Sequence, residues 1–173
     1  MAENLAKKLV ATLSGFLALP FGKELIVFVI SLMPILELRG GLIAASLLNM
    51  DPWKSYVIAM VGNLIPVPFI LLFIEKILKW MRGCKIGFLN KAANWLYNLA
   101  DRKKAQIEKY GFWGLVLFVG IPLPGTGAWT GCLVAALLHM DKKKALLATF
   151  LGVLLASVIM MLVSFGIIGS IIR

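Results

Sequence analysis

Cysteine, histidine and acidic residues are all scarce in this sequence, which has 2 cysteines, 1 histidine and 8 Asp and Glu among 173 residues. Cys84 lies in a predicted loop and Cys132 in an apolar segment, so the two indicate neither a disulfide framework nor a metal site. A nucleotide-binding glycine loop and a Ser/His/Asp arrangement are missing as well. We therefore expect no metal, no cofactor and no enzymatic activity.

The 18 Lys and Arg outnumber the 8 Asp and Glu, which gives a net charge of +10. In a soluble protein this charge would suggest a nucleic-acid partner. Here the bases flank apolar segments, the mean hydropathy is +0.93 and only 15% of residues are charged. A soluble domain of this size would have to bury nearly all of its residues. The composition therefore predicts an integral membrane protein with no nucleic-acid partner. Its basic residues would lie in cytoplasmic loops and beside anionic lipid head groups.

Two apolar stretches, each interrupted by prolines and glycines, repeat one another at an offset of ninety positions. Chance matches of Leu and Ala are expected in a chain that is 61% hydrophobic. Other matched types are not explained by composition: Pro34 with Pro124, Gly41 with Gly131, Met50 with Met140, Asp51 with Asp141, Lys54 with Lys144 and Gly62 with Gly152. Duplicated halves with interrupted apolar segments are typical of secondary transporters, in which the binding site lies where the two broken elements meet.

Only residues 55–80 and 145–172 are long enough to span a bilayer, because a spanning helix needs about 20 apolar residues. The shorter stretches around each break predict helical hairpins over residues 25–50 and 115–140. An arm of about ten residues rises about 15 Å, which reaches only the middle of a hydrocarbon core about 30 Å thick. We predict an all-α integral membrane fold of two inverted repeats, each a re-entrant helical hairpin plus one transmembrane helix, with interfacial amphipathic helices.

The chain is predicted to form a single membrane domain, residues 1–173. In order, its parts are an N-terminal interfacial helix (1–22), the first repeat (23–80), a cytoplasmic amphipathic segment (81–110) and the second repeat (111–173). Basic residues gather from position 76 to 109 and at 142–144, so the positive-inside rule places the centre in the cytoplasm and both termini outside. If residues 3–21 span the membrane instead, the N-terminus is cytoplasmic and the centre is unchanged.

Glu37 and Arg39 lie in the first break, Pro34-Ile35-Leu36-Glu37-Leu38-Arg39-Gly40-Gly41, which the arm lengths place near the middle of the membrane. Ionisable groups at that depth are rare, paired and usually functional. We expect the break to turn both side chains into one cavity, where Arg39 binds an anionic group through its planar guanidinium. Glu37 would be the counter-ion of Arg39 and a proton acceptor. The alternative is a permanent structural ion pair between the two.

The second break, residues 121–131, has no charge and offers backbone groups and hydroxyls instead. Its prolines set the turn, its glycines permit close approach, and free amides at the start of the next helix attract anions. Asn63, at a predicted kink of the first span, either faces the cavity or bonds structurally. The predicted substrate-binding residues are Glu37, Arg39, Gly40, Gly41, Asn63, Pro122, Pro124, Gly125, Thr126, Gly127 and Thr130.

These two motifs resemble those of a bacterial family labelled small multidrug export proteins, which in turn resembles the DedA superfamily, also called VTT proteins. The resemblance implies a multi-pass transport protein of the bacterial cytoplasmic (inner) membrane. DedA relatives are associated with proton-coupled transport and with moving undecaprenyl phosphate and other phospholipids between leaflets.

Residue by residue, Arg39 matches the arginine expected after the proline of one DedA hairpin, and Pro122, Pro124 and Gly125 match the Pro-x-Pro-Gly of the other. DedA proteins commonly follow that motif with an acid. Here Thr126 stands in its place, and the acid, Glu37, lies on the break that carries the arginine. The order of the two motifs along the chain is exchanged.

Three functions fit the sequence. The first is a flippase of an anionic lipid or polyprenyl phosphate, with the head group at Arg39 and the amides of the second break. The second is a proton-coupled exporter of small cationic drugs that bind Glu37, and the third is a membrane assembly factor without transport activity. Free amides at a helix N-terminus favour the first, and an unpaired acid with aromatic neighbours favours the second. Since two spans close a pathway poorly, we expect a homodimer surrounded by membrane lipids.

Overall fold

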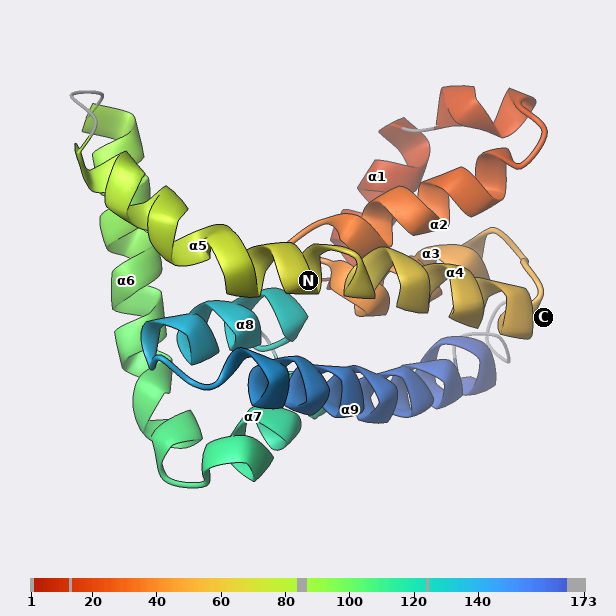
Figure 1. The fold of residues 1–173 in the computed structure, drawn as a ribbon. Helices are drawn as coiled ribbons and strands as arrows, with labels where there is room; N and C mark the ends of the chain where they lie inside the picture. Colours follow the sequence, from red (N-terminus) through yellow and green to blue (C-terminus); the bar gives the residue numbers. More distant parts are fainter. Residues whose placement is uncertain (1, 13, 84–86, 124, 168–173) are drawn as a thin grey trace.

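The computed structural model describes residues 2–12, 14–83, 87–123 and 125–167, and this part of the chain is helical without any strand. The predicted all-α class is confirmed. Figure 1 labels the elements, which are α1 (Ala2–Thr12), η1 (Ser14–Ala18), α2 (Gly22–Leu32), α3 (Glu37–Leu47), α4 (Pro52–Leu64), α5 (Pro66–Gly83), α6 (Gly87–Glu108), α7 (Gly111–Gly120), α8 (Ala128–Leu137), α9 (Lys142–Met161) and η2 (Leu162–Ile167).

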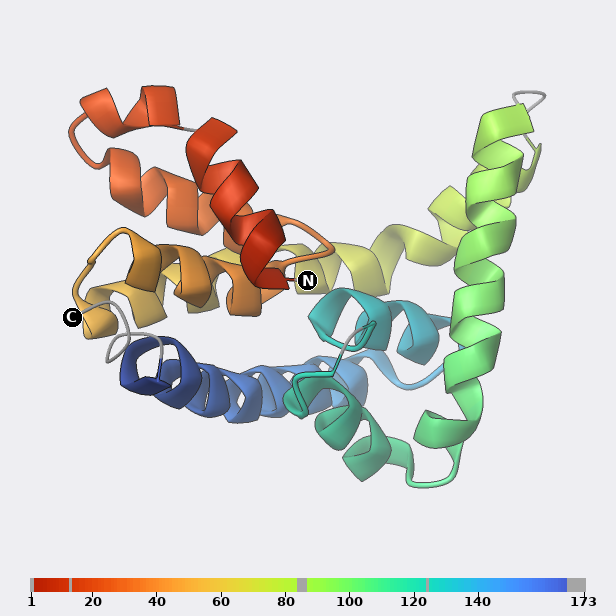
Figure 2. The ribbon, with the colours of Figure 1, turned by 180° about the vertical axis from the view of Figure 1, so that it is seen from behind.

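Two helical segments are long and apolar enough to cross a membrane, Pro52–Gly83 and Lys142–Gly166, with mean hydropathies of 2.5 and 2.7. These two candidate spans agree with the two long apolar segments of the sequence, 55–80 and 145–172, of which residues 168–172 lie outside the described residues. The first is divided at Ile65 into α4 and α5, because Pro66 cannot donate the helical hydrogen bond that would continue the ladder. Figures 1 and 2 show the two segments side by side and running in opposite directions.

Two pairs of short helices, α2 with α3 and α7 with α8, flank these long segments. The first break is shorter than the sequence suggests, because α3 already begins at Glu37 and includes Gly40 and Gly41. Two glycines in a helix cost about 1 kcal/mol each relative to alanine. Close packing offsets this cost: both glycines are buried, and a Cβ at Gly41 would overlap the hydroxyl of Ser31 on α2. The second break covers residues 121–127, and α8 begins at Ala128.

Helix starts in the two halves repeat at the offset seen in the sequence. Asp51 caps α4 by accepting a hydrogen bond from the Lys54 amide at 2.8 Å, and Asp141 caps α9 by accepting from the Lys144 amide at 3.0 Å. Such caps stabilise a helix by about 1 kcal/mol. The residues before them also match in backbone geometry: Asn49 and His139 have φ of 51° and 54°.

Helix contacts repeat in the same way through one matched glycine pair. A Cβ at Gly62 would lie 2.9 Å from the Phe28 carbonyl oxygen of α2, and one at Gly152 would lie 2.8 Å from the Val116 carbonyl oxygen of α7. Any larger residue would push the long helix away from the first helix of its pair. The sequence duplication therefore has a counterpart in local structure.

The ends of the molecule differ in charge. The end of α5, all of α6 and the start of α9 lie together at one end, where α6 runs crosswise to α9 (Figures 1 and 2). These elements contain most of the basic residues. Arg82 of α5 stacks on Tyr97 of α6 at 3.8 Å and donates to Asn94 at 3.1 Å, which attaches α6 to α5. The predicted amphipathic helix thus forms over nearly the expected range.

The N-terminal segment differs from the single helix expected over residues 1–22. It consists of α1 and the short 3₁₀ helix η1. α1 packs mainly on α3, with Ala6 fully buried and Leu9 and Val10 half-buried against the core.

Candidate functional site

The Glu37 carboxylate binds the N-terminus of α8, which belongs to the other half of the chain. Its Oε2 accepts a hydrogen bond from the Ala128 amide and its Oε1 accepts one from the Trp129 amide, both at 3.0 Å. The side chain is only 5% exposed. A carboxylate is well placed there, because the first amides of a helix lack partners within the helix and its N-terminus carries partial positive charge.

Backbone geometry at Glu37 and Gly127 makes this contact possible. Glu37 has φ of +51°, a left-handed conformation that costs a non-glycine residue about 1–2 kcal/mol. Gly127, the residue before α8, has φ of +135°, and a Cβ there would overlap the Glu37 carboxylate. Residues in such conformations cluster at functional sites. Glu37 and Gly127 are also matched positions of the two halves, ninety residues apart.

Arg39 also reaches the second break, and it binds oxygens there. One guanidinium nitrogen, Nη1, donates to the Leu123 carbonyl oxygen at 2.7 Å. The other, Nη2, donates to the Ile121 carbonyl oxygen at 3.3 Å and to Thr126 Oγ1 at 3.1 Å. The half-buried guanidinium thereby fixes the turn that leads into α8. We call the contacts of Glu37 and Arg39 with residues 121–129 the junction.

The expected ion pair between Glu37 and Arg39 does not form among the described residues. The carboxylate instead binds amides and the guanidinium binds carbonyl and hydroxyl oxygens. The sequence placed both side chains in a flexible break, whereas both stand in the first turn of α3. They reach the same segment because the positive φ of Glu37 departs from regular helix geometry.

The remaining predicted residues of the second break lie around the junction to different degrees. Thr126 contacts Arg39 directly. Gly125 is exposed with φ of +77°, and Pro122 is half-buried in the turn. Thr130 is half-buried in the first turn of α8. Pro124 lies outside the described residues.

Gly40, Gly41 and Asn63 make none of the junction contacts found in the described residues. Gly40 and Gly41 are packing positions inside α3. Asn63 is the buried second-last residue of α4, and its Oδ1 has no hydrogen-bond partner among the described residues. The Trp129 indole Nε1 is a second buried atom in that condition. Unpaired buried polar atoms cost free energy.

Sequence reasoning missed the carbonyls of Ile121 and Leu123, which bind Arg39, and it missed that Glu37 binds the amides of Ala128 and Trp129. Backbone groups carry no residue-type signal. The free amides at the start of the second helix were expected to bind an anion, but the anion that binds them is the protein's own Glu37.

Residues 37–159, well over half of the chain, match the family described as "Putative small multi-drug export protein". The chain belongs to this family. The matched range begins at Glu37 and includes Arg39, the second break and nearly all of α9. Members of an export family are membrane transport proteins, not enzymes, which agrees with the two apolar long helices. No curated protein and no solved structure matches the chain. The resemblance to the DedA superfamily has no counterpart in these comparisons and stays a prediction.

Proposed function

We propose that the protein is a proton-coupled exporter of small lipophilic cations, in which Glu37 binds either a proton or the cation. The observation that supports this most is the state of Glu37. It is a buried acid that forms no ion pair among the described residues, and the amide of an aromatic residue, Trp129, lies 3.0 Å from Oε1. A buried acid without a cationic partner in the protein suits a positively charged cargo, because a buried charge is stable only when it is paired.

Protonation of Glu37 would weaken the junction. An ionised carboxylate accepts at both oxygens, whereas the acid form carries an O–H donor on one of them. Both α8 amides then face a neutral acceptor, and one of them faces a hydroxyl oxygen; a hydrogen bond to a charged group contributes about 1.5–3 kcal/mol, against about 0.5–1.5 kcal/mol for a neutral one. Because the junction joins the two halves of the chain, its weakening lets them move relative to one another.

Exchange follows from the use of one carboxylate for two ligands. A cation binds the ionised form, and a proton that enters from the outside neutralises Glu37 and releases the cation. Return of the empty protein with its proton releases that proton in the cytoplasm. Arg39 does not compete in this scheme, because its Nη1 and Nη2 already donate to oxygens of the second break.

A lipid or polyprenyl phosphate is less well supported as cargo. The amides that would bind the phosphate are occupied by Glu37, and three hydrogen bonds of the guanidinium go to the turn. A phosphate would have to displace both sets of contacts. The family description also refers to drug export, which favours a transporter of cationic drugs over a lipid flippase or a membrane assembly factor.

We also propose that α2–α3 and α7–α8 are re-entrant hairpins of two inverted repeats in a multi-pass protein of the inner membrane. Helices of 10 or 11 residues rise about 15–17 Å, half of a hydrocarbon core about 30 Å thick. Contact between the matched positions Glu37 and Gly127 supports a two-fold axis through the junction, since equivalent points meet only near an axis. The opposite directions of the two long segments support inversion.

The distribution of basic residues supports a particular orientation of the protein in the membrane. The end with α6 would be cytoplasmic by the positive-inside rule, and α6 would lie in the membrane surface crosswise to the spans. Two long helices enclose a pathway poorly, so we propose a homodimer as the transporting unit, surrounded by membrane lipids.

Transport by proteoliposomes that contain the purified full-length protein tests the function. An imposed pH gradient should drive accumulation of tetraphenylphosphonium by the wild type and not by Glu37→Gln. Glu24→Gln is the matched control, since Glu24 is an acid outside the junction, hydrogen-bonded to Lys54. Equal transport by Glu37→Gln and wild type would refute the role of Glu37. Transport of a labelled polyprenyl phosphate without transport of the cation would refute the exporter function and support the flippase function.

A further inference from the structure

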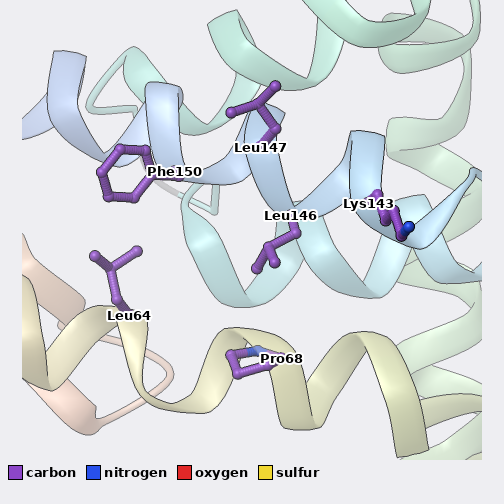
Figure 3. Close-up of a pocket in the computed structure, with 6 residues that line it drawn as sticks. All are labelled: Leu64, Pro68, Lys143, Leu146, Leu147 and Phe150. Carbon is purple, nitrogen blue, oxygen red and sulfur yellow. The ribbon is translucent and has the colours of Figure 1, made fainter.

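A groove of about 450 Å³ lies between the first long segment and α9. It is lined by Leu64, Pro68, Lys143, Leu146, Leu147 and Phe150, none of which belongs to the junction. Figure 3 shows Leu64 and Pro68 on one wall and the four α9 residues on the other, with Pro68 facing Leu146. Leu146, Leu147 and Phe150 are 43%, 54% and 41% exposed, so the groove is open at the surface.

Its polarity is graded along its length. Lys143, the one charged lining residue, stands in the first turn of α9, and Phe150 stands at the other end of the row (Figure 3). Seven residues of helix separate them, about 10 Å. The neighbouring Lys142 and Lys144 are also exposed. An amine thus lies at the membrane-surface end and apolar side chains extend from it towards the membrane interior.

A molecule that matches this gradient has an anionic head and an apolar chain. The basic end of the protein is the end assigned to the cytoplasm, where the membrane leaflet carries anionic lipids that attract Lys and Arg near the surface. A cationic or zwitterionic head group would place positive charge beside Lys143 or gain less from it. Charge complementarity therefore selects the occupant.

We propose that this groove binds an acyl chain of an anionic phospholipid whose phosphate is bound by Lys143. The site is separate from the cargo site and does not depend on what the protein exports. The bound lipid would fill the space between α9 and the α4–α5 turn, and so would stabilise the packing of the two long segments.

Native mass spectrometry of the purified full-length protein, delipidated in detergent, tests the site. The protein is titrated with phosphatidylglycerol, and in parallel with phosphatidylcholine of the same acyl chains. We expect one phosphatidylglycerol to bind with higher affinity than any phosphatidylcholine. Lys143→Ala should weaken phosphatidylglycerol binding about tenfold more than Lys142→Ala does, since a hydrogen bond to a charged group is lost only in the first variant. Both variants change the net charge equally, so general attraction to anionic lipid cancels in the comparison.

The apolar part of the groove is tested with Leu146→Trp, which fills it. Val158→Trp is the control, because Val158 is 56% exposed on the same helix and does not line the groove. Loss of lipid binding in the first variant alone supports the site. Equal effects of Lys142→Ala and Lys143→Ala, or unchanged binding in a folded Leu146→Trp protein, would overturn it. Cross-linking of Leu147→Cys to a second copy, with no lipid bound to the wild type, would assign the groove to a dimer interface instead.

Discussion

Replacing Gly127 by alanine perturbs the junction from the side of α8. The new Cβ would lie 2.7 Å from both Cδ and Oε1 of Glu37, and the backbone φ of +135° is unsuited to any residue but glycine. The carboxylate must then leave the α8 amides or the turn must move. Glu37→Ala removes the same carboxylate from the other side, so the two changes act on one contact.

The magnitudes follow from the contacts. Two hydrogen bonds to a charged group contribute about 1.5–3 kcal/mol each, so Glu37→Ala should lower the free energy of unfolding by about 3–6 kcal/mol. Gly127→Ala should cost a similar amount plus about 1–3 kcal/mol of backbone strain. In the double variant only the strain is added to the loss of the carboxylate. Its cost should therefore be smaller than the sum of the single costs by about 3 kcal/mol or more.

Reversible unfolding of the protein in mixed detergent micelles, followed by circular dichroism, measures these free energies. Gly125→Ala is the matched control, because φ there is also positive, at +77°, but no atom lies within 4 Å of the new Cβ. It should show strain alone and should add to Glu37→Ala without coupling. If Gly127→Ala also adds independently, or is as mild as Gly125→Ala, the contact between Glu37 and the start of α8 is refuted.

Three further predictions use other parts of the molecule. Arg39→Lys should fold but lose at least two of the three hydrogen bonds to the second break, because an ammonium cannot reproduce the guanidinium fork. We expect the variant to transport severalfold more slowly with an unchanged circular dichroism spectrum, and full transport activity would contradict the role of Arg39. Single cysteines at the exposed Asn49 and Asp141, in a background without native cysteines, should react with an impermeant reagent from opposite sides of the membrane, and reaction from one side would refute the inverted topology. The hydrogen bond from Lys54 lowers the pKa of Glu24 below its usual 4.5. This surface pair therefore contributes its full stability above the usual pKa and loses it as the pH falls through the lowered pKa. Glu24→Gln should reduce the free energy of unfolding by no more than about 1 kcal/mol at pH 7, and by less at pH 3.

Helix length and type were predictable from the sequence because apolar length is a local property. The two spans and α6 form over nearly the expected ranges. The matched caps at Asp51 and Asp141 also follow from residues close to them in the chain.

The start of α3 was not predictable, because glycines have two opposite uses. The pair Gly40 and Gly41 was interpreted as part of a break, yet Gly41 lies inside a helix where its missing side chain lets α3 pack against α2. Only the neighbouring helix distinguishes the two uses. The left-handed backbone of Glu37 was not predictable either, because glutamate rarely adopts that conformation.

The contacts of Glu37 and Arg39 were out of reach for a different reason. Their partners lie more than eighty positions away and are backbone groups, except for Thr126. The nearest opposite charge was the simplest partner in the sequence, and so an ion pair was expected. Folding instead gave the acid a helix N-terminus and the base a set of carbonyls, which are the partners that each charge prefers.

The proposed exchange requires that one carboxylate, Glu37, binds either a proton or the transported cation. Proton release on cation binding measures this most directly, with purified protein in weakly buffered detergent solution, a pH indicator and added tetraphenylphosphonium. The wild type should release up to one proton per cation bound over the pH range in which Glu37 is protonated, and Glu24→Gln should behave like the wild type. Cation binding without proton release at any pH, or the same release from Glu37→Gln, would contradict the account.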